Sequence, residues 1–206
     1  MGVEGGGHRP QSRLSAARPR TAQFYASGRK AIPAAHVIGI RRATPSDAAA
    51  LAVLGRDTFT ETFGRRYPAE DLTAFLDEAH EPGLYADWVA DPAFGLWIAE
   101  TEGALVGYAL AGPCHLPHPE VTADCGELWR LYVRAEAQGA GLGVRLLEQA
   151  FAWLERPGRR LWIGVWSENL GAQRLYARYG FSKVGDYAFS VGETRDHEFI
   201  LARPGS

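Results

Sequence analysis

The stretch EAQGAGLGVRLLEQA, residues 136–150, places three glycines at alternate positions directly before an amphipathic helix. The glycines are Gly139, Gly141 and Gly143. The apolar residues behind them recur at helical spacing, and the pattern ends at the RPG sequence of residues 156–158. A strand-like run, ELWRLYV at residues 127–133, comes before them. The sequence therefore predicts a strand, a glycine loop and the first turn of a helix in succession.

A glycine loop that leads into a helix is typical of a phosphate-binding site. Glycine lets the backbone reach φ > 0 and approach a bound group without a Cβ in the way. The helix start adds unpaired N–H donors and a partial positive charge. Both effects favour a bound phosphate group. The spacing of the glycines then indicates which kind of phosphate site this is.

The composition describes one globular domain that follows a polar segment. The chain has 206 residues, 46% hydrophobic and 22% charged, as in ordinary globular proteins. Residues 1–37 are rich in Gly, Arg, Ala, Ser and Pro, and Glu4 is their only acid. We expect a disordered extension there, because so little apolar surface can be buried; its arginines also suit an organelle transit peptide. The globular domain is expected over residues 38–206.

Charge, cysteines and hydropathy exclude several classes of protein. The formal net charge of -2 offers no broad basic surface to nucleic acid. Cys114 and Cys125 lack CxxC spacing and are too few for a disulfide scaffold, so we expect neither disulfides nor a metal site. No apolar run reaches the roughly 18–20 residues that span a bilayer, and no signal-peptide pattern follows the start. The sequence predicts a cytoplasmic protein that binds neither nucleic acid nor membrane.

From residue 38 the pattern of hydrophobicity and turns predicts the order β-α-α-β-β-β-α-β-α-β-β. The expected strands are residues 38–44, 94–101, 104–112, 127–133, 159–166, 181–191 and 196–202. The expected helices are residues 44–64, 68–80, the glycine-loop helix that ends before residue 156, and 169–180. This order predicts an α/β protein, a mixed sheet with helices on its faces.

The glycine spacing does not fit two common phosphate loops. A Walker loop has the pattern GxxxxGK[ST], and QGAGLGVR lacks Lys and Ser/Thr where that pattern needs them. A dinucleotide fold has GxGxxG early in a parallel βαβ array, with an acid roughly 20 residues further on. Here GxGxG lies late in the chain and follows a hairpin. QGAGLG fits a third pattern, Q/R-x-x-G-x-G.

That pattern and two others, in the same order, resemble the GNAT superfamily of N-acetyltransferases. ELWRLYV resembles the central strand of the family, QGAGLGVRLL its pyrophosphate loop and helix, and SENLGAQRLYARYGF its N-x-x-A-x-x-L-Y-x-x-x-G-F segment. The last pattern is filled by Asn169, Ala172, Leu175, Tyr176, Gly180 and Phe181. The resemblance runs from Ile38 to the end of the chain. It implies the GNAT acyl-CoA N-acyltransferase fold, whose α+β mixed sheet is mostly antiparallel, and transfer of an acetyl group from acetyl-CoA to an amine.

The resemblance also implies which residues bind acetyl-CoA, the co-substrate, with no metal involved. Backbone groups along Leu131, Tyr132 and Val133 would pair with the pantetheine arm as an added strand does. Donors around the pyrophosphate would come from Gln138, Gly139, Ala140, Gly141, Leu142, Gly143 and Val144. Asn169 would cap its helix and reach the pantetheine arm. Arg145 would either add charge near a phosphate or simply be solvated.

Acetyl transfer from a thioester needs a neutral amine, a stabilised oxyanion and a proton for the departing thiolate. An amine of pKa about 10.4 must lose a proton before it attacks. Tyr176 is the expected general acid because its phenol can protonate a thiolate; the alternative is a core aromatic. Glu127 is the expected general base, unless it is only a solvated charge at the end of a strand. The weaker candidates are Asp186, His197, His115 and His118.

The acceptor is expected between the first helices and the final hairpin. The stretch FTETFGRRYPAED, residues 59–71, offers acids and an aromatic that suit a cationic amine, or else forms an ordinary solvated helix end. These residues are Glu61, Tyr67, Glu70 and Asp71.

DTFTETFG and GVWSEN are similar to the bacterial polyamine-type branch of the family. That similarity implies a small primary amine such as a polyamine, which attacks acetyl-CoA directly in a ternary complex. Acetylation of a protein N-terminus or a lysine, and a non-catalytic acetyl-CoA sensor, are the alternatives. The sequence also leaves open whether the last strands pair two chains into a homodimer.

Overall fold

A computed structural model describes residues 38–139 and 141–205 of the chain. The segment 1–37, predicted to be a disordered extension, and Ala140 lie outside the described residues. The strands are β1 (Gly39–Arg42), β2 (Gly95–Thr101), β3 (Ala104–Pro113), β4 (Gly126–Val133), β5 (Leu161–Trp166), β6 (Ser182–Val191) and β7 (Thr194–Arg203). The α-helices are α1 (Ala48–Phe63), α2 (Ala69–Ala79), α3 (Pro82–Ala90), α4 (Leu142–Leu154) and α5 (Leu170–Arg178).

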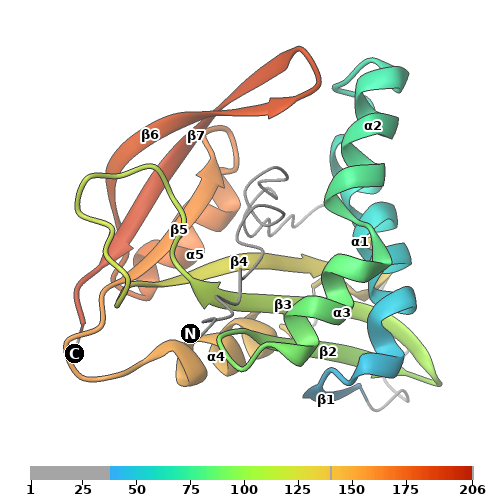
Figure 1. The fold of residues 1–206 in the computed structure, drawn as a ribbon, viewed down its shortest axis with the longest axis horizontal. Helices are drawn as coiled ribbons and strands as arrows, with labels where there is room; N and C mark the ends of the chain where they lie inside the picture. Colours follow the sequence, from blue (N-terminus) through green and yellow to red (C-terminus); the bar gives the residue numbers. More distant parts are fainter. Residues whose placement is uncertain (1–37, 140, 206) are drawn as a thin grey trace, which may run out of the picture.

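The seven strands form one sheet in the order β1-β2-β3-β4-β5-β7-β6 (Figure 1). All neighbours are antiparallel except β4 and β5, which run parallel. Residues 126–128 of β4 pair with residues 161–163 of β5, and within the described chain the pairing stops there. Beyond this point β4 and β5 separate, so β4 keeps an unpaired edge over residues 129–133. The predicted mixed, mostly antiparallel sheet is confirmed.

Helices cover both faces of this sheet, and among the described residues each face packs into a large core of its own. On one face α4 and α5 pack on Leu128, Leu131 and Ile163. On the other face α1 and α3 pack on Trp129 and Tyr132. The alternation of side chains along β4 explains this division, because successive residues of a strand point to opposite faces.

A β-bulge interrupts that alternation in β4. Leu110 of β3 pairs with Arg130 and Ala111 pairs with Leu128, so Trp129 is the extra residue. A bulge bends its strand and re-aims a side chain. Trp129 and Arg130 therefore both face α1 and α3, and β4 bends at the point where it leaves β5.

Arg130 is fully buried and forms a polar cluster with residues of α2 and α3. Its Nη1 donates to the Tyr85 hydroxyl at 2.6 Å and lies 3.1 Å from Nδ1 of His80, and its Nη2 donates to the carbonyl of Ala79 at 2.7 Å. Burial lowers the pKa of His80 well below its usual value, so this imidazole is neutral. Gly55 of α1 lies directly against the cluster, since a Cβ there would be 2.2 Å from the Tyr85 hydroxyl. The cluster fixes three helices to the bulged strand.

The predicted helices and strands are confirmed, with one omission. Thr44 caps the short 3₁₀ turn Pro45–Asp47 before α1, and Pro45 lies at the start of this turn. Helix α3 was not predicted, because its nine residues are too short for a clear apolar stripe and include Gly83. Pro82 at its first position was the available signal. None of the described helices has the length and hydropathy needed to cross a membrane.

Candidate active site

The glycine loop begins α4 in the backbone conformation that the sequence predicts. Gly141 is the N-cap of α4 with φ of 74°, and Gly139 has φ of 87°. A Cβ on either residue would meet no described atom within 4 Å, so the loop faces open space. The first four N–H groups of an α-helix have no partner inside the helix, and its dipole is positive at this end. The loop is therefore a cradle that fits an anion.

The loop is fixed to the end of β4 and to the core beneath it. Gln138 donates from Nε2 to the carbonyl of Val133 at 2.9 Å. Leu142 is buried and Val144 is half-buried, and both pack against the core under α4. Arg145 is exposed and donates to the carbonyl of Ile38 at 3.3 Å. These contacts hold the loop next to the C-terminal end of β4.

The unpaired part of β4 contains the three residues predicted to hold the pantetheine arm. Leu131 and Val133 point their side chains into the core under α4. Tyr132 points to the opposite face and stacks on Tyr108 at 5.6 Å between ring centroids. All three side chains are engaged, so the edge toward β5 offers only backbone groups. Such an edge suits an extended ligand bound as an added strand.

Tyr176 and Asn169 lie on α5, which follows β5. Tyr176 is fully buried and contacts Phe181 edge-on, with 6.3 Å between ring centroids. Burial, and then nearby Tyr132, raise the pKa of the Tyr176 phenol well above its usual value, so it stays protonated. The ring is therefore a core aromatic, and its protonated hydroxyl lies near Tyr132 of β4.

The predicted cap of α5 is confirmed. Asn169 accepts the N–H of Ala172 on Oδ1 at 3.0 Å. Its Nδ2 is buried, and no described residue accepts a hydrogen bond from it. A buried donor without a partner costs about 1–3 kcal/mol. This amide is therefore suited to donate to a bound molecule.

Glu127 is not a solvated charge at the end of a strand. Its side chain is 0% exposed, and its Oε2 accepts the backbone N–H of His115 at 2.9 Å. Its other oxygen, Oε1, has no hydrogen-bond partner among the residues that the structure describes. Burial and the neighbouring Glu127 carboxylate raise the pKa of the Cys114 thiol. Glu127 is thus a buried side chain held through one of its two oxygens.

Three of the weaker candidates lie elsewhere. His118 places its ring on Trp162, 4.9 Å between centroids. Asp186 is exposed and pairs with Lys183 at 3.3 Å and with His197 at 3.7 Å. The described contacts of these residues do not include Glu127 or Tyr176. His115 is the exception, since it contacts Glu127.

The residues predicted to bind the acceptor divide into two groups. Tyr67 donates its hydroxyl to Asp196 of β7, and Asp71 accepts the N–H of Glu193 at 3.3 Å, so both join the first helices to the final hairpin. In Figure 1 α2 faces the tip of the β6–β7 hairpin. Glu61 instead pairs with Arg134 at 3.7 Å, and Glu70 is exposed.

Glu198 of β7 is an acid that the sequence reading missed. It is fully buried and accepts the hydroxyl of Tyr187 at 2.9 Å. It pairs in register with Trp166 of β5, on the same face of the sheet as Glu127. Its place two residues before Ile200 in DHEFILA was the available signal, because alternate residues of a strand share one face.

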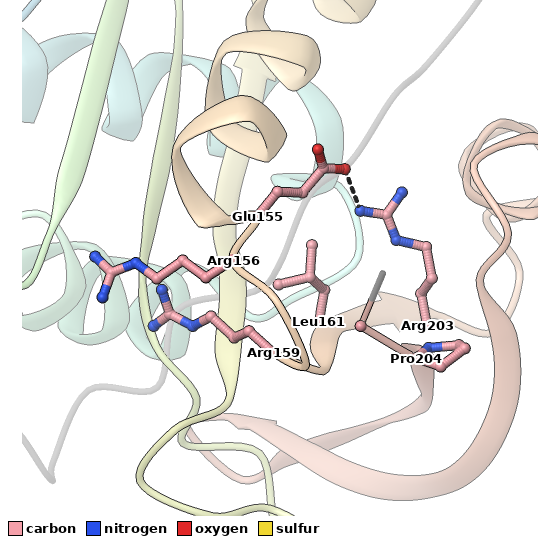
Figure 2. Close-up of a pocket in the computed structure, with 7 residues that line it drawn as sticks. Glu155, Arg156, Arg159, Leu161, Arg203 and Pro204 are labelled. Atoms are coloured by element: carbon pink, nitrogen blue, oxygen red, sulfur yellow. Dashed lines mark hydrogen bonds and ion pairs between the residues drawn. The ribbon is translucent and has the colours of Figure 1, made fainter.

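A shallow pocket at the other end of α4 does not belong to this site. It is lined by Glu155, Arg156, Arg159, Leu161, Arg203, Pro204 and Gly205. Figure 2 shows Glu155 paired with Arg203, at 2.6 Å, while Arg156 and Arg159 point away from that pair. The 13 residues of α4 separate this pocket from the glycine loop by about 20 Å. No predicted site residue lines it.

Comparison with known proteins finds N-acetyltransferases. The model of the acetyltransferase (GNAT) family matches residues 56–181. An uncharacterized N-acetyltransferase of Lactobacillus delbrueckii subsp. lactis is 28% identical over 171 residues, which are 81% of this chain and 96% of that protein. The spermine/spermidine N(1)-acetyltransferase of Bacillus subtilis is 31% identical over 93 residues, 43% of this chain and 60% of that protein.

Among solved structures, the PaiA N-acetyltransferase of Thermoplasma acidophilum in complex with coenzyme A has a similar fold. The TM-score is 0.62 with 19% sequence identity, over 82% of this chain and 99% of that one. At this identity the likeness concerns the fold alone.

Proposed function

The chain belongs to the acetyltransferase (GNAT) family, and on this premise we propose that it acetylates a small, cationic primary amine such as a polyamine. Its family makes it an acetyl-CoA-dependent N-acetyltransferase. The acceptor and the roles of individual residues are our proposal. Both parts of the proposal follow from the place where β4 and β5 stop pairing and from the side chains near it.

On the donor side, the N–H groups of residues 141–144 bind the pyrophosphate of acetyl-CoA. The positive φ of Gly141 and the open space above it support this role. The free edge of β4 at Leu131 and Val133 pairs with the pantetheine arm. The Nδ2 of Asn169, which has no acceptor among the described residues, donates to the same arm. The thioester then lies between β4 and β5, close to Tyr176.

Transfer needs one base and one acid. The acceptor ammonium loses a proton either to the Glu127 carboxylate or to a group that this carboxylate orients, and the amine nitrogen attacks the carbonyl carbon of the thioester. The C–N bond forms, the C–S bond breaks, and the thiolate takes the proton of Tyr176. The new amide nitrogen releases its second proton, which balances the one that Tyr176 gave. No covalent enzyme intermediate is required.

The proposal of a cationic acceptor rests on buried carboxylates near the acceptor side. Glu127 and Glu198 are both 0% exposed, and both lie on the face of the sheet where the first helices meet the hairpin. A buried carboxylate is unfavourable unless a cation or hydrogen bonds compensate it. At Glu127, whose Oε1 has no hydrogen-bond partner among the described residues, a cationic amine would supply that charge. Tyr67 and Asp71 bind the β6–β7 hairpin and so limit the space between the first helices and the hairpin. A limited space favours a small molecule over a protein as the acceptor.

A thiol-release assay with acetyl-CoA tests the proposal. The panel contains spermidine, an aminoglycoside, free amino acids, a peptide with a free N-terminus and a lysine peptide. We expect the highest kcat/KM with spermidine. Turnover with peptides alone would assign the chain to protein acetylation. Binding of acetyl-CoA without turnover of any amine would make it a sensor.

A further inference from the structure

The imidazole of His115 lies against the buried carboxylate of Glu127. Its Nδ1 is 2.8 Å from Oε2, the same oxygen that accepts the backbone N–H of His115 at 2.9 Å. The side chain of Glu127 is 0% exposed, whereas that of His115 is 26% exposed. The two residues therefore connect a buried carboxylate to an imidazole at the edge of solvent.

Packing holds the imidazole in this place. The Trp129 ring lies 4.0 Å from the His115 ring between centroids, tilted by 32°. The indole N–H of Trp129 donates to the carbonyl of Pro113 at 2.8 Å, so the bulge of β4 also fixes the start of the loop. Although Nδ1 of His115 lies close to Oε2 of Glu127, the two atoms are not aligned for a hydrogen bond in this structure. Catalytic pairs in free enzymes are often poorly aligned and tighten when substrate binds.

An imidazole with a carboxylate behind it is a better base than a carboxylate alone. An unperturbed glutamate has a pKa of about 4.3 and an unperturbed histidine about 6.5, closer to neutral pH. When Nδ1–H donates to a carboxylate, Nε2 carries the lone pair and can accept a proton. The buried carboxylate then stabilises the imidazolium as it forms.

We propose that His115 takes the proton from the acceptor ammonium and that Glu127 orients His115. This inference rests on the proposed function and specifies its base. The proton moves from the ammonium nitrogen to Nε2, directly or through one water, and leaves a neutral amine to attack the thioester. The imidazolium donates from Nδ1 to Oε2 of Glu127. Nε2 then gives its proton to solvent, which the partial exposure of His115 allows.

Paired substitutions test this arrangement through thiol release. In His115→Asn the amide nitrogen replaces Nδ1 and can still donate to Glu127, but no Nε2 remains. We expect kcat to fall about 100-fold with little change in either KM, and Glu127→Gln to have a loss of similar size. The double variant should fall no further, because residues that act as a unit are not additive. His118→Asn, in the same loop with its ring on Trp162, should keep the wild-type rate.

Two results would overturn the proposal: wild-type kcat in His115→Asn, or losses that multiply in the double variant. Either result would mean that Glu127 acts without His115. A fold defect is separated from a chemical one by His115→Ala with added imidazole. We expect imidazole to restore part of the rate, and no restoration would count against a chemical role.

A second readout does not depend on turnover. Nitrogen-15 NMR of the free protein should show the neutral His115 ring protonated at Nδ1, with the signal assigned by its loss in His115→Asn. Protonation at Nε2 instead would overturn the pairing with Glu127. If the wild-type enzyme turned over no amine at all, the proposed function would fail, and the NMR result would still decide the pair.

Discussion

The proposed binding site for acetyl-CoA, the donor region, is formed by backbone groups. The proposed binding site for the amine, the acceptor region, is formed by side chains. The proposed donor region is nearly continuous in sequence: the edge of β4 at residues 131–133, which β5 does not pair within the described chain, is followed by the glycine loop, and we propose that both bind through their backbone. The acceptor region is assembled from side chains of distant segments, among them Tyr67, His115, Glu127 and Glu198. A backbone site depends on local conformation, whereas a side-chain site depends on the packing of the whole sheet.

The two regions meet at Tyr176, where we expect the largest effect. Tyr176→Phe keeps the buried ring but removes the proton donor, so kcat should fall about 100-fold. The affinity for acetyl-CoA should change by less than about twofold, because the ring still packs. Steady-state thiol release gives the first quantity and calorimetry the second. Unchanged thioester consumption with every working acceptor would remove Tyr176 from the mechanism.

The polar cluster around Arg130, which packs the first helices on β4, should lose stability when a single methyl group is added next to it. In Gly55→Ala the new Cβ would lie 2.2 Å from the Tyr85 hydroxyl and 2.4 Å from Nδ1 of His80. Both groups are buried and bonded to Arg130, so neither can move freely. We expect a loss of about 1–3 kcal/mol in the free energy of unfolding, although alanine favours a helix by about 1 kcal/mol.

Thermal unfolding measures this effect, with Gly83→Ala as the matched control. Gly83 is also in a helix, but a Cβ there would meet only the side chain of Glu81, at 3.3 Å. A stability equal to that of the control would show that the cluster around Arg130 does not constrain α1.

The donor region should respond to backbone strain alone. Gly141→Val places a branched side chain at φ of 74°, which costs about 1–2 kcal/mol. If the free loop of the variant relaxes and must return to this conformation to bind, acetyl-CoA should bind roughly 5–30-fold more weakly, while the KM of the amine stays constant. Gly158→Val is the control, since Gly158 has the same φ of 74° and open space around it, after the end of α4. Equal acetyl-CoA affinity in both variants would contradict the proposal that the glycine loop binds the pyrophosphate.

The smallest effect is expected at Glu198. Glu198→Gln keeps the shape and the contact with Tyr187 but removes one charge. A hydrogen bond to a charged group exceeds a neutral one by about 1 kcal/mol, so the KM of spermidine should rise roughly fivefold. The KM of acetyl-CoA should not change. If acetyl-CoA were affected instead, Glu198 would belong to the donor region.

The same division explains what could be predicted from the sequence. The glycine conformations, the helix cap of Asn169 and a strand over residues 127–133 depend on neighbouring residues, and local patterns predicted them. The parallel pairing of β4 with β5, the bulge at Trp129 and the burial of Glu198 depend on contacts between remote segments. Single-residue periodicity does not contain that information. The contact of His115 with Glu127 likewise arises from a loop that folds back on its own strand.

Calorimetric titration of the wild-type protein with acetyl-CoA and with acetyl-pantetheine tests the central claim most directly. Acetyl-pantetheine carries the thioester arm without the pyrophosphate, so it reaches the edge of β4 but not the start of α4. The account predicts that acetyl-CoA binds at least about tenfold more tightly, a difference of about 1.4 kcal/mol. Equal affinity for the two molecules, or no uptake of acetyl-CoA, would contradict it.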